Sequence, residues 1–234
     1  MKTFGIATIN YKRRQVLKLW LAQITRLKTD LDMHIPCVVV SGEEDKDLCA
    51  QHGVWHITYK NRPVHEKFNR AYEYMKSIDV DYVILSGSDD IMSTDTLRNI
   101  MVEMEKGTDL IGVTTLYFYA GDGRDRGKLV KLTHRNILAP AKTVSKRVLD
   151  ICDWYLWRPY KDEGHNAGLD QLMTKTIRPH CKTKKAVEGF VVDVKTRECQ
   201  MNRFNIWGNR LPEVNPQEFY NILSDKELEI LKRL

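Results

Sequence analysis

The chain has 234 residues, of which 42% are hydrophobic and 29% charged, and this composition excludes a disordered or low-complexity protein. Lysine and arginine number 37 against 31 aspartates and glutamates, a net charge of +6. This mild excess suits anionic ligands such as nucleotides or nucleic acid, and it is equally compatible with a charge that serves only solubility. No run of about 18 apolar residues occurs, and the apolar part of the opening MKTFGIATINYKRR is too short for a signal peptide, so neither a transmembrane helix nor a signal peptide is expected.

Strands and helices alternate through the first half of the chain. In order, the pattern predicts a strand at 4–9, a helix at 12–28, a strand at 35–41, a short helix at 43–53, a strand at 54–58, a helix at 65–78, a strand at 81–87 and a helix that begins at Ser93 or Thr94. The 65–78 helix is the clearest, because Phe68, Ala71 and Met75 recur at helical spacing. This alternation predicts an α/β, Rossmann-like fold with a mostly parallel central sheet and helices on both faces.

The second half of the chain is less regular. Its expected elements are strands at 109–121, 128–136 and 186–196, helices at 145–152 and 168–177, and one or two outer helices at 215–234. No Pro-, Gly- or Ser-rich linker separates the halves. We therefore expect a single domain over 1–234, with a regular first half at 1–115 and a more irregular second half at 116–234.

The five cysteines are scattered along the chain and lack the CxxC spacing of zinc sites. They are Cys37, Cys49, Cys152, Cys181 and Cys199. An odd number without paired spacing argues against a disulfide framework and against a zinc knuckle. A reducing cytoplasm is therefore the expected location.

Polar residues follow each of the four strands predicted in the first half. They lie at Asn10, at 41–42, at 59–61 and at 86–90. In open parallel sheets, ligands bind outside the carboxyl ends of the strands. These four loops are therefore expected to crowd one edge of the sheet and to present Asp89 and Asp90 to a ligand crevice.

Asp89 and Asp90 stand together in the stretch YVILSGSDDIMSTDTL. Aspartates between a strand and a helix often do no more than form a polar turn. Here Ser93 or Thr94 already supplies the N-cap of the next helix, which leaves the aspartates without that role. Because hard cations such as Mn²⁺ and Mg²⁺ take carboxylate oxygens as ligands, we interpret the stretch as a candidate metal site, with a plain polar turn as the alternative.

Five segments of the chain resemble, in the expected order, nucleotide-sugar-dependent glycosyltransferases of the glycosyltransferase A fold, near the inverting family 2 type. The segments are TINYKRR, VVVSGEED, GVWHITYKNRPVHEKFNRAYEY, VILSGSDDI and HNAGLDQLM. The resemblance is strongest over 4–115, weaker over 140–178 and weakest beyond. The chain departs from the family at the Asp-x-Asp motif, because its first acidic position is occupied by Gly87.

The resemblance implies transfer of a hexosyl or pentosyl group from a nucleoside diphosphate sugar, UDP-linked in the first instance, to an acceptor hydroxyl with inversion. It implies a divalent cation, Mn²⁺ or Mg²⁺, held by Asp89 and Asp90, with His134 as a further ligand. It also makes Asp170 the base that takes the proton of the acceptor hydroxyl. His134 and Asp170 each have a structural alternative. A lone histidine is more often structural, and an aspartate in the first turn of a helix offsets the helix macrodipole.

The donor-binding residues that the resemblance implies come mostly from the predicted strand ends and the helix at 65–78. They are Thr8, Asn10, Arg13, Ser41, Glu43, Asn61, Lys67, Asn69, Arg70 and Ser88. Lys67 and Arg70 share one helix face, so both could point at phosphates, although two cations on a polar face are often simply solvated. Asp193 and Lys195 stand two residues apart on a predicted strand, so both can face the cleft, although no motif marks them.

The second half of the chain interleaves cations with aromatic residues, as in TIRPHCKTKK and MNRFNIWGNR. Basic grooves with aromatic platforms suit nucleic acid and an extruded base. The chain also resembles compact phage-type transferases, which favours a hydroxymethylated pyrimidine in DNA as acceptor and a host cytoplasm as location. A cell-surface saccharide or glycolipid is the alternative acceptor. A nucleotide- or DNA-binding module without catalysis is a third interpretation; Gly87 favours it, and the presence of both Asp89 and Asp170 argues against it.

Overall fold

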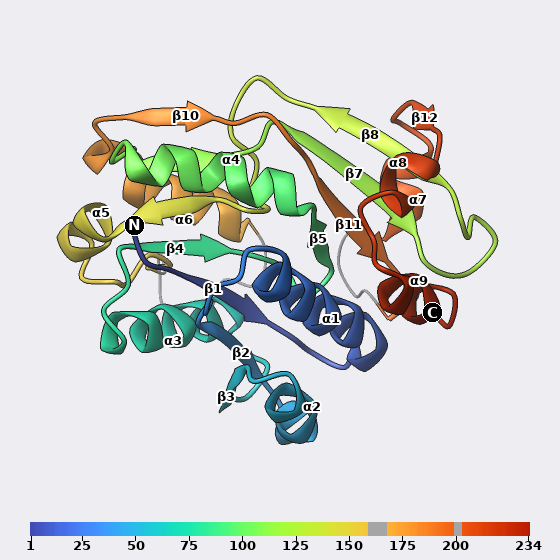
Figure 1. Ribbon diagram of the computed structural model, residues 1–234, viewed down its shortest axis with the longest axis horizontal. Helices are drawn as coiled ribbons and strands as arrows, with labels where there is room; N and C mark the ends of the chain where they lie inside the picture. Colours follow the sequence, from blue (N-terminus) through green and yellow to red (C-terminus); the bar gives the residue numbers. More distant parts are fainter. Residues whose placement is uncertain (159–167, 199–202) are drawn as a thin grey trace.

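The computed structural model describes residues 1–158, 168–198 and 203–234 (Figure 1). The strands are β1 (Phe4–Ile9), β2 (Cys37–Ser41), β3 (Trp55–Thr58), β4 (Tyr82–Leu85), β5 (Asp90–Met92), β6 (Leu110–Gly112), β7 (Thr115–Ala120), β8 (Leu129–Thr133), β9 (Thr143–Ser145), β10 (Lys184–Ala186), β11 (Val191–Lys195) and β12 (Glu213–Val214). The helices are α1 (Arg14–Asp30), α2 (Lys46–Gln51), α3 (Val64–Ser77), α4 (Thr94–Glu105), α5 (Lys146–Ile151), α6 (Leu169–Ile177), α7 (Phe204–Gly208), α8 (Gln217–Tyr220) and α9 (Asp225–Leu231), with 3-10 turns at Glu43–Asp45 and Arg178–His180.

A seven-stranded, mostly parallel sheet forms the centre of the fold, in the order β10-β6-β9-β4-β1-β2-β3. The strands β4, β1, β2 and β3 run parallel, whereas β9 is antiparallel to both of its neighbours. Side chains alternate along β1, so Ile6 packs in a core with α1 and α4, and Ala7 packs in a second core with α3, α5 and α6. Helices therefore cover both faces, and the predicted α/β, Rossmann-like architecture is confirmed.

The elements predicted in the first half match the structure to within a few residues. Ser93 is the N-cap of α4, and its hydroxyl accepts a hydrogen bond from the Thr96 N–H at 3.0 Å. The aspartates before it are thus free of the capping role, as the sequence analysis supposed. Asp90 is nevertheless not in a loop, since it begins the short strand β5.

A second sheet, in the order β12-β8-β7-β11-β5, lies beside the first (Figure 1). The prediction of one strand over 109–121 is wrong, because β6 belongs to the first sheet and β7 to the second. The apolar run is continuous across both strands and therefore hides the break between them. Strands β9 and β10 were not predicted, since TVS and KKA are short and carry no apolar alternation.

The C-terminal helix α9 packs against α1. The Arg26 guanidinium donates to the buried Glu227 carboxylate at 2.9 Å and to the Met92 carbonyl at 3.0 Å. The outer helices expected at 215–234 are thus confirmed as α8 and α9. Within the described ranges, no helix has both the length and the apolar character needed to cross a membrane.

Candidate active site

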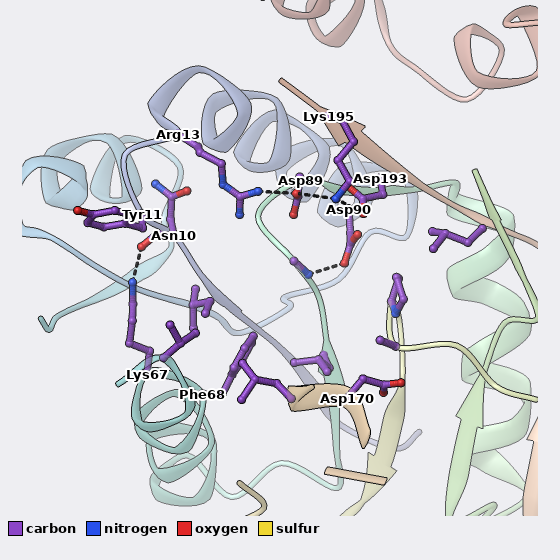
Figure 2. Close-up of a pocket in the computed structure, with 18 of the residues that line it drawn as sticks. Asn10, Tyr11, Arg13, Lys67, Phe68, Asp89, Asp90, Asp170, Asp193 and Lys195 are labelled. Carbon is purple, nitrogen blue, oxygen red and sulfur yellow. Dashed lines mark hydrogen bonds and ion pairs between the residues drawn. The ribbon is translucent and has the colours of Figure 1, made fainter. Parts of the chain in front are cut away.

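A cavity of about 690 Å³ opens where β1 and β4 end and the second sheet begins (Figure 2). Its wall takes residues from both sheets and from α3 and α6. Asn10, Asn61, Asp89 and Asp90, from three of the four predicted strand-end loops, line it. The fourth loop, at 41–42, is not part of the described lining.

Three carboxylates, those of Asp89, Asp90 and Asp193, meet at one end of the cavity (Figure 2). One oxygen of each lies within 4.8 Å of the other two. The antiparallel pairing of β5 with β11 sets Asp193 opposite Asp90, and the Val194 N–H donates to the Asp89 carbonyl at 2.8 Å. Two neighbouring carboxylates from the predicted stretch are therefore joined by a third from a strand about a hundred residues later.

Two cations face this carboxylate cluster. The Arg13 guanidinium forms a short ion pair with Asp89 and also donates to the Ser88 hydroxyl at 2.8 Å. The Lys195 ammonium lies 2.6 Å from an Asp193 oxygen and 3.6 Å from an Asp89 oxygen. Asp193 and Lys195 thus share a strand face and reach the cleft, as their spacing allowed.

The carboxylates of the cluster differ in acidity. Burial opposes ionisation of Asp89, but the adjacent Arg13 and Lys195 charges prevail and lower its pKa to about 2. Burial and the Asp89 charge raise the pKa of Asp90 to about 7. Burial also raises the pKa of Asp193, against the opposing effect of Lys195. Burying several carboxylates close together raises the free energy of the folded protein unless nearby cations offset their charge. Carboxylates with shifted pKa values of this kind are typical of functional sites.

The cluster fits a divalent cation. Its donors are hard oxygens, and one buried oxygen of Asp193 has no hydrogen-bond partner in the described part of the chain. At position 87, where the family has its first carboxylate, a Cβ would lie 2.7 Å from an Asp89 oxygen and 2.9 Å from an Asp90 oxygen. Gly87 leaves room for its own N–H to donate to the Asp90 carboxylate, and Asp193 brings the number of clustered carboxylates to three.

Asn10, just after β1, links the carboxylate cluster to Asp45 and Lys67. Its side-chain oxygen accepts from the Ser88 hydroxyl at 3.0 Å, and its amide donates to the buried Asp45 at 2.8 Å. Its carbonyl accepts from the Lys67 ammonium. Burial, and next the charge of Arg13, lower the pKa of Lys67 to about 8. Lys67 lines the cavity, and its ammonium therefore loses its proton closer to neutral pH than that of an ordinary lysine.

The other residues of α3 that were predicted to bind the donor point elsewhere. Arg70 is half-exposed and pairs with Glu73 at 2.9 Å, so it does not act together with Lys67. The buried Asn69 exchanges two 3.2 Å hydrogen bonds with the Trp157 backbone. Neither Arg70 nor Asn69 is among the described residues that line the cavity.

Three other predicted donor residues lie on β1, on β2 and in the turn after β2. Thr8 is completely buried in the sheet. The Ser41 hydroxyl lies 3.0 Å from His56 Nε2, and the exposed Glu43 accepts from Thr58 and from Lys46. The described part of the chain does not bring these three residues to the cavity lining.

Asp170, on α6, lines the cavity and stands apart from the carboxylate cluster (Figure 2). Gly168 precedes this helix with φ +67°, a conformation that favours glycine. The Asp170 carboxylate is 44% exposed and forms a short ion pair with Lys142, whose side chain is only 2% exposed. The first three residues of the HNAGLDQLM segment lie outside the described residues.

His134 is not brought to the cluster. It is exposed beyond the end of β8, and its Nδ1 accepts from the Asn136 N–H at 3.1 Å. The third carboxylate near the predicted pair comes instead from Asp193.

Several cavity residues were not singled out in the sequence as site residues. Tyr11, Arg62 and Glu198 line the cavity, and Lys142 lies behind Asp170. A signal existed for Tyr11, which lies inside the TINYKRR segment. None existed for Lys142, since only the fold brings it beside Asp170.

Comparison with known proteins supports the fold at low sequence identity. No protein-family profile and no curated protein matches the chain. A structure of residues 1–349 of TarS from S. aureus matches with a TM-score of 0.57 and 15% identity, over 82% of this chain and 60% of that one. A longer TarS structure matches with a TM-score of 0.58 and 15% identity, over 94% of this chain and 38% of that one. The chain thus spans less than two thirds of either TarS structure.

A weaker likeness is to 4-diphosphocytidyl-2C-methyl-D-erythritol synthase from Anaerococcus prevotii. The TM-score is 0.46 and the identity 13%, over 80% of this chain and 87% of that one, which is too slight to support any inference. The TarS matches show that the chain shares an α/β, Rossmann-like fold with these structures.

Proposed function

We propose that the protein is a glycosyltransferase that moves a sugar from a nucleoside diphosphate sugar to an acceptor hydroxyl with inversion. UDP is the nucleotide that we propose for the donor. The observation that carries this proposal is the cluster of Asp89, Asp90 and Asp193 at the strand-end edge of the cavity. A further carboxylate, Asp170, lines the same cavity apart from the cluster. Sugar transfer needs both a place for the leaving diphosphate and a separate proton acceptor.

The two sides of the cavity then have different tasks. Asp89, Asp90 and Asp193 would hold Mn²⁺ or Mg²⁺, which neutralises the charge that develops on the leaving diphosphate. Arg13 and Lys67 add positive charge on the donor side. We assign the donor to the first half of the chain, 1–115, and the acceptor to 116–234, with β11 contributing to the donor side.

Asp170 serves as the base in this proposal. Its carboxylate takes the proton of the acceptor hydroxyl while the acceptor oxygen forms a bond to the anomeric carbon of the sugar. The bond between that carbon and the diphosphate oxygen breaks, and the nucleoside diphosphate leaves with the electron pair. Lys142 holds the Asp170 carboxylate through its ion pair. As acceptor we propose a hydroxymethylated pyrimidine, of which DNA is the source we favour.

Calorimetric titration of UDP with and without Mn²⁺ tests the proposal. In the wild type we expect Mn²⁺ to strengthen UDP binding by about tenfold or more, because the cation joins the carboxylates to the diphosphate. Asp89→Asn should lose this dependence, since it removes the ionised member of the cluster. Asp95→Asn, an exposed carboxylate at the start of α4, is the matched control and should keep it.

The outcomes test the metal–diphosphate site and the glycosyltransferase activity separately. UDP binding that ignores Mn²⁺ in the wild type would show that the carboxylate cluster is not a metal–diphosphate site. No binding of UDP or of any other nucleoside diphosphate would exclude the glycosyltransferase. Binding without slow hydrolysis of any donor sugar would instead favour a nucleotide-binding module.

The titration of Lys67 predicts how UDP binding depends on pH. Its pKa of about 8 means that the ammonium is charged at pH 7 and largely neutral at pH 9, while the phosphates of UDP stay ionised. Without a divalent cation, so that ionisation of Asp90 with its pKa of about 7 does not strengthen metal binding over the same range, UDP affinity should therefore fall by about tenfold from pH 7 to pH 9. Lys67→Met keeps the length of the side chain without its charge, and should bind UDP weakly at both pH values. An equal fall in wild type and variant would assign the titration to another group.

A further inference from the structure

Strand β5, which begins with Asp90 of the carboxylate cluster, is the edge strand of the second sheet. Strand β11 pairs with one side of β5 and sets Asp193 opposite Asp90. An edge strand leaves the N–H and C=O groups of its other side without a strand partner. Because β5 is buried and packs against α1, these groups cannot turn to water and need partners on the helix.

Gln23 of α1 supplies these partners. Its Nε2–H donates to the Asp90 carbonyl at 3.1 Å, and its Oε1 accepts from the Met92 N–H. One side-chain amide therefore takes the place that a peptide group of a neighbouring strand would have. Gln23 is completely buried among the mostly apolar residues of α1. An amide in this position would destabilise the fold if either hydrogen bond were missing.

The residues one turn before and one turn after Gln23, on the same face of α1, bind the same stretch of chain. The Trp20 Nε1–H donates to the Ser86 hydroxyl at 2.9 Å, and the Arg26 guanidinium donates to the Met92 carbonyl at 3.0 Å. One face of α1 therefore holds the chain both before and after the two neighbouring aspartates. Gln23 lies between these two contacts and bonds to a member of the carboxylate cluster itself.

We propose that Gln23 is a positioning residue for the divalent cation, because its amide fixes β5 so that the Asp90 carboxylate stays beside Asp193. This inference rests on the proposed function, in which the carboxylate cluster holds Mn²⁺ or Mg²⁺. The hydrogen bond to the Asp90 carbonyl acts on the residue that carries the carboxylate, so a shift of β5 moves that ligand directly. Since these cations bind well only when their oxygen ligands are held in place, loss of the Gln23 amide weakens the site.

The test is the affinity of the full chain for Mn²⁺, measured alone and with saturating UDP by electron paramagnetic resonance of the free ion. Gln23→Met keeps the length of the side chain and removes both hydrogen bonds. We expect this variant to bind Mn²⁺ about tenfold or more weakly, the range found when the outer partners of metal ligands are removed. Its UDP affinity without a divalent cation should not change, because the hydrogen bonds of Gln23 go to β5 and not to Lys67. A merely structural role would lower stability without this selective loss of Mn²⁺ affinity.

Leu27→Ala is the matched control. Leu27 is completely buried one turn beyond Gln23 on α1, and its apolar side chain makes no hydrogen bond. The variant should therefore lose stability and bind Mn²⁺ like the wild type. If Gln23→Met does not fold, Gln23→Asn replaces it with the same expected loss, because its amide lies one methylene short of β5.

Two results would overturn the inference alone. They are wild-type Mn²⁺ affinity in a folded Gln23 variant, and an equal loss of Mn²⁺ affinity in Leu27→Ala. A wild-type protein that binds no Mn²⁺, alone or with UDP, would instead contradict the metal site of the proposed function and remove the basis of the inference.

Discussion

Asp170→Asn is expected to lower the rate of sugar transfer by about 10²- to 10⁴-fold, the range that a positioned general base contributes. Asparagine keeps the size of the side chain but cannot accept the proton of the acceptor hydroxyl. UDP affinity should not change, because Asp170 stands apart from the carboxylate cluster (Figure 2). The measurement is the initial rate of transfer from the UDP-sugar that the wild type hydrolyses, compared with UDP affinity from calorimetry.

The control for this variant uses the other partner of Lys142. The Lys142 ammonium also donates to the Thr174 hydroxyl at 2.8 Å, so Thr174→Val disturbs the same buried lysine without touching the carboxylate. We expect Thr174→Val to transfer sugar at close to the wild-type rate. A folded Asp170→Asn protein that transfers sugar as fast as Thr174→Val would show that another group, such as Glu198 in the cavity wall, takes the proton.

Lys142 explains how a half-exposed carboxylate can be held in one place. The Leu85 N–H at the end of β4 donates to the Lys142 carbonyl at 2.9 Å, which fixes the backbone of the lysine against the central sheet. Its side chain then runs, buried, to Asp170 and Thr174 on α6. A buried ammonium without a charged partner in this position would destabilise the folded protein. Asp170 and Lys142 therefore stabilise each other's position.

The first half of the fold was predictable because its signals are local. The apolar residues of α3 recur at helical spacing, and β1, β2 and β4 are short apolar runs that end in polar residues. The second sheet was not predictable in the same way. Strands β5 and β12 are three and two residues long and exist only because distant strands pair with them.

The residues of the candidate site were likewise predictable where their sequence signal is local, and not where it depends on the pairing of distant strands. Asp89 and Asp90 were found from one contiguous stretch, because a buried strand, two carboxylates and a separate N-cap are all visible there. Asp193 could be placed on a strand face but not beside Asp90, since the pairing of β5 with β11 spans about a hundred residues. Arg70 shows the opposite case: it shares a face with Lys67, yet its neighbour Glu73 holds it at the surface.

Trp157→Ala is expected to lower the free energy of unfolding by about 3–5 kcal/mol, the cost of removing a large buried aromatic side chain. Trp157 is 1% exposed, stacks on Phe68 at 4.9 Å and meets Tyr72 edge-on at 5.1 Å. Its indole N–H donates to the Leu169 carbonyl at 3.1 Å. Urea unfolding followed by circular dichroism measures the loss. Trp157→Phe keeps a ring and should cost only about 1–2 kcal/mol, mainly for the lost hydrogen bond.

The same side chain joins the two sides of the proposed reaction. Phe68 and Tyr72 belong to α3, which carries Lys67, and Leu169 begins α6, which carries Asp170. Removing the indole should therefore lower the transfer rate of the folded Trp157→Ala protein more than its UDP affinity, because α6 loses its anchor while Lys67 keeps its bond to Asn10. A variant that is destabilised but transfers sugar at the wild-type rate would show that Asp170 is held by Lys142 alone.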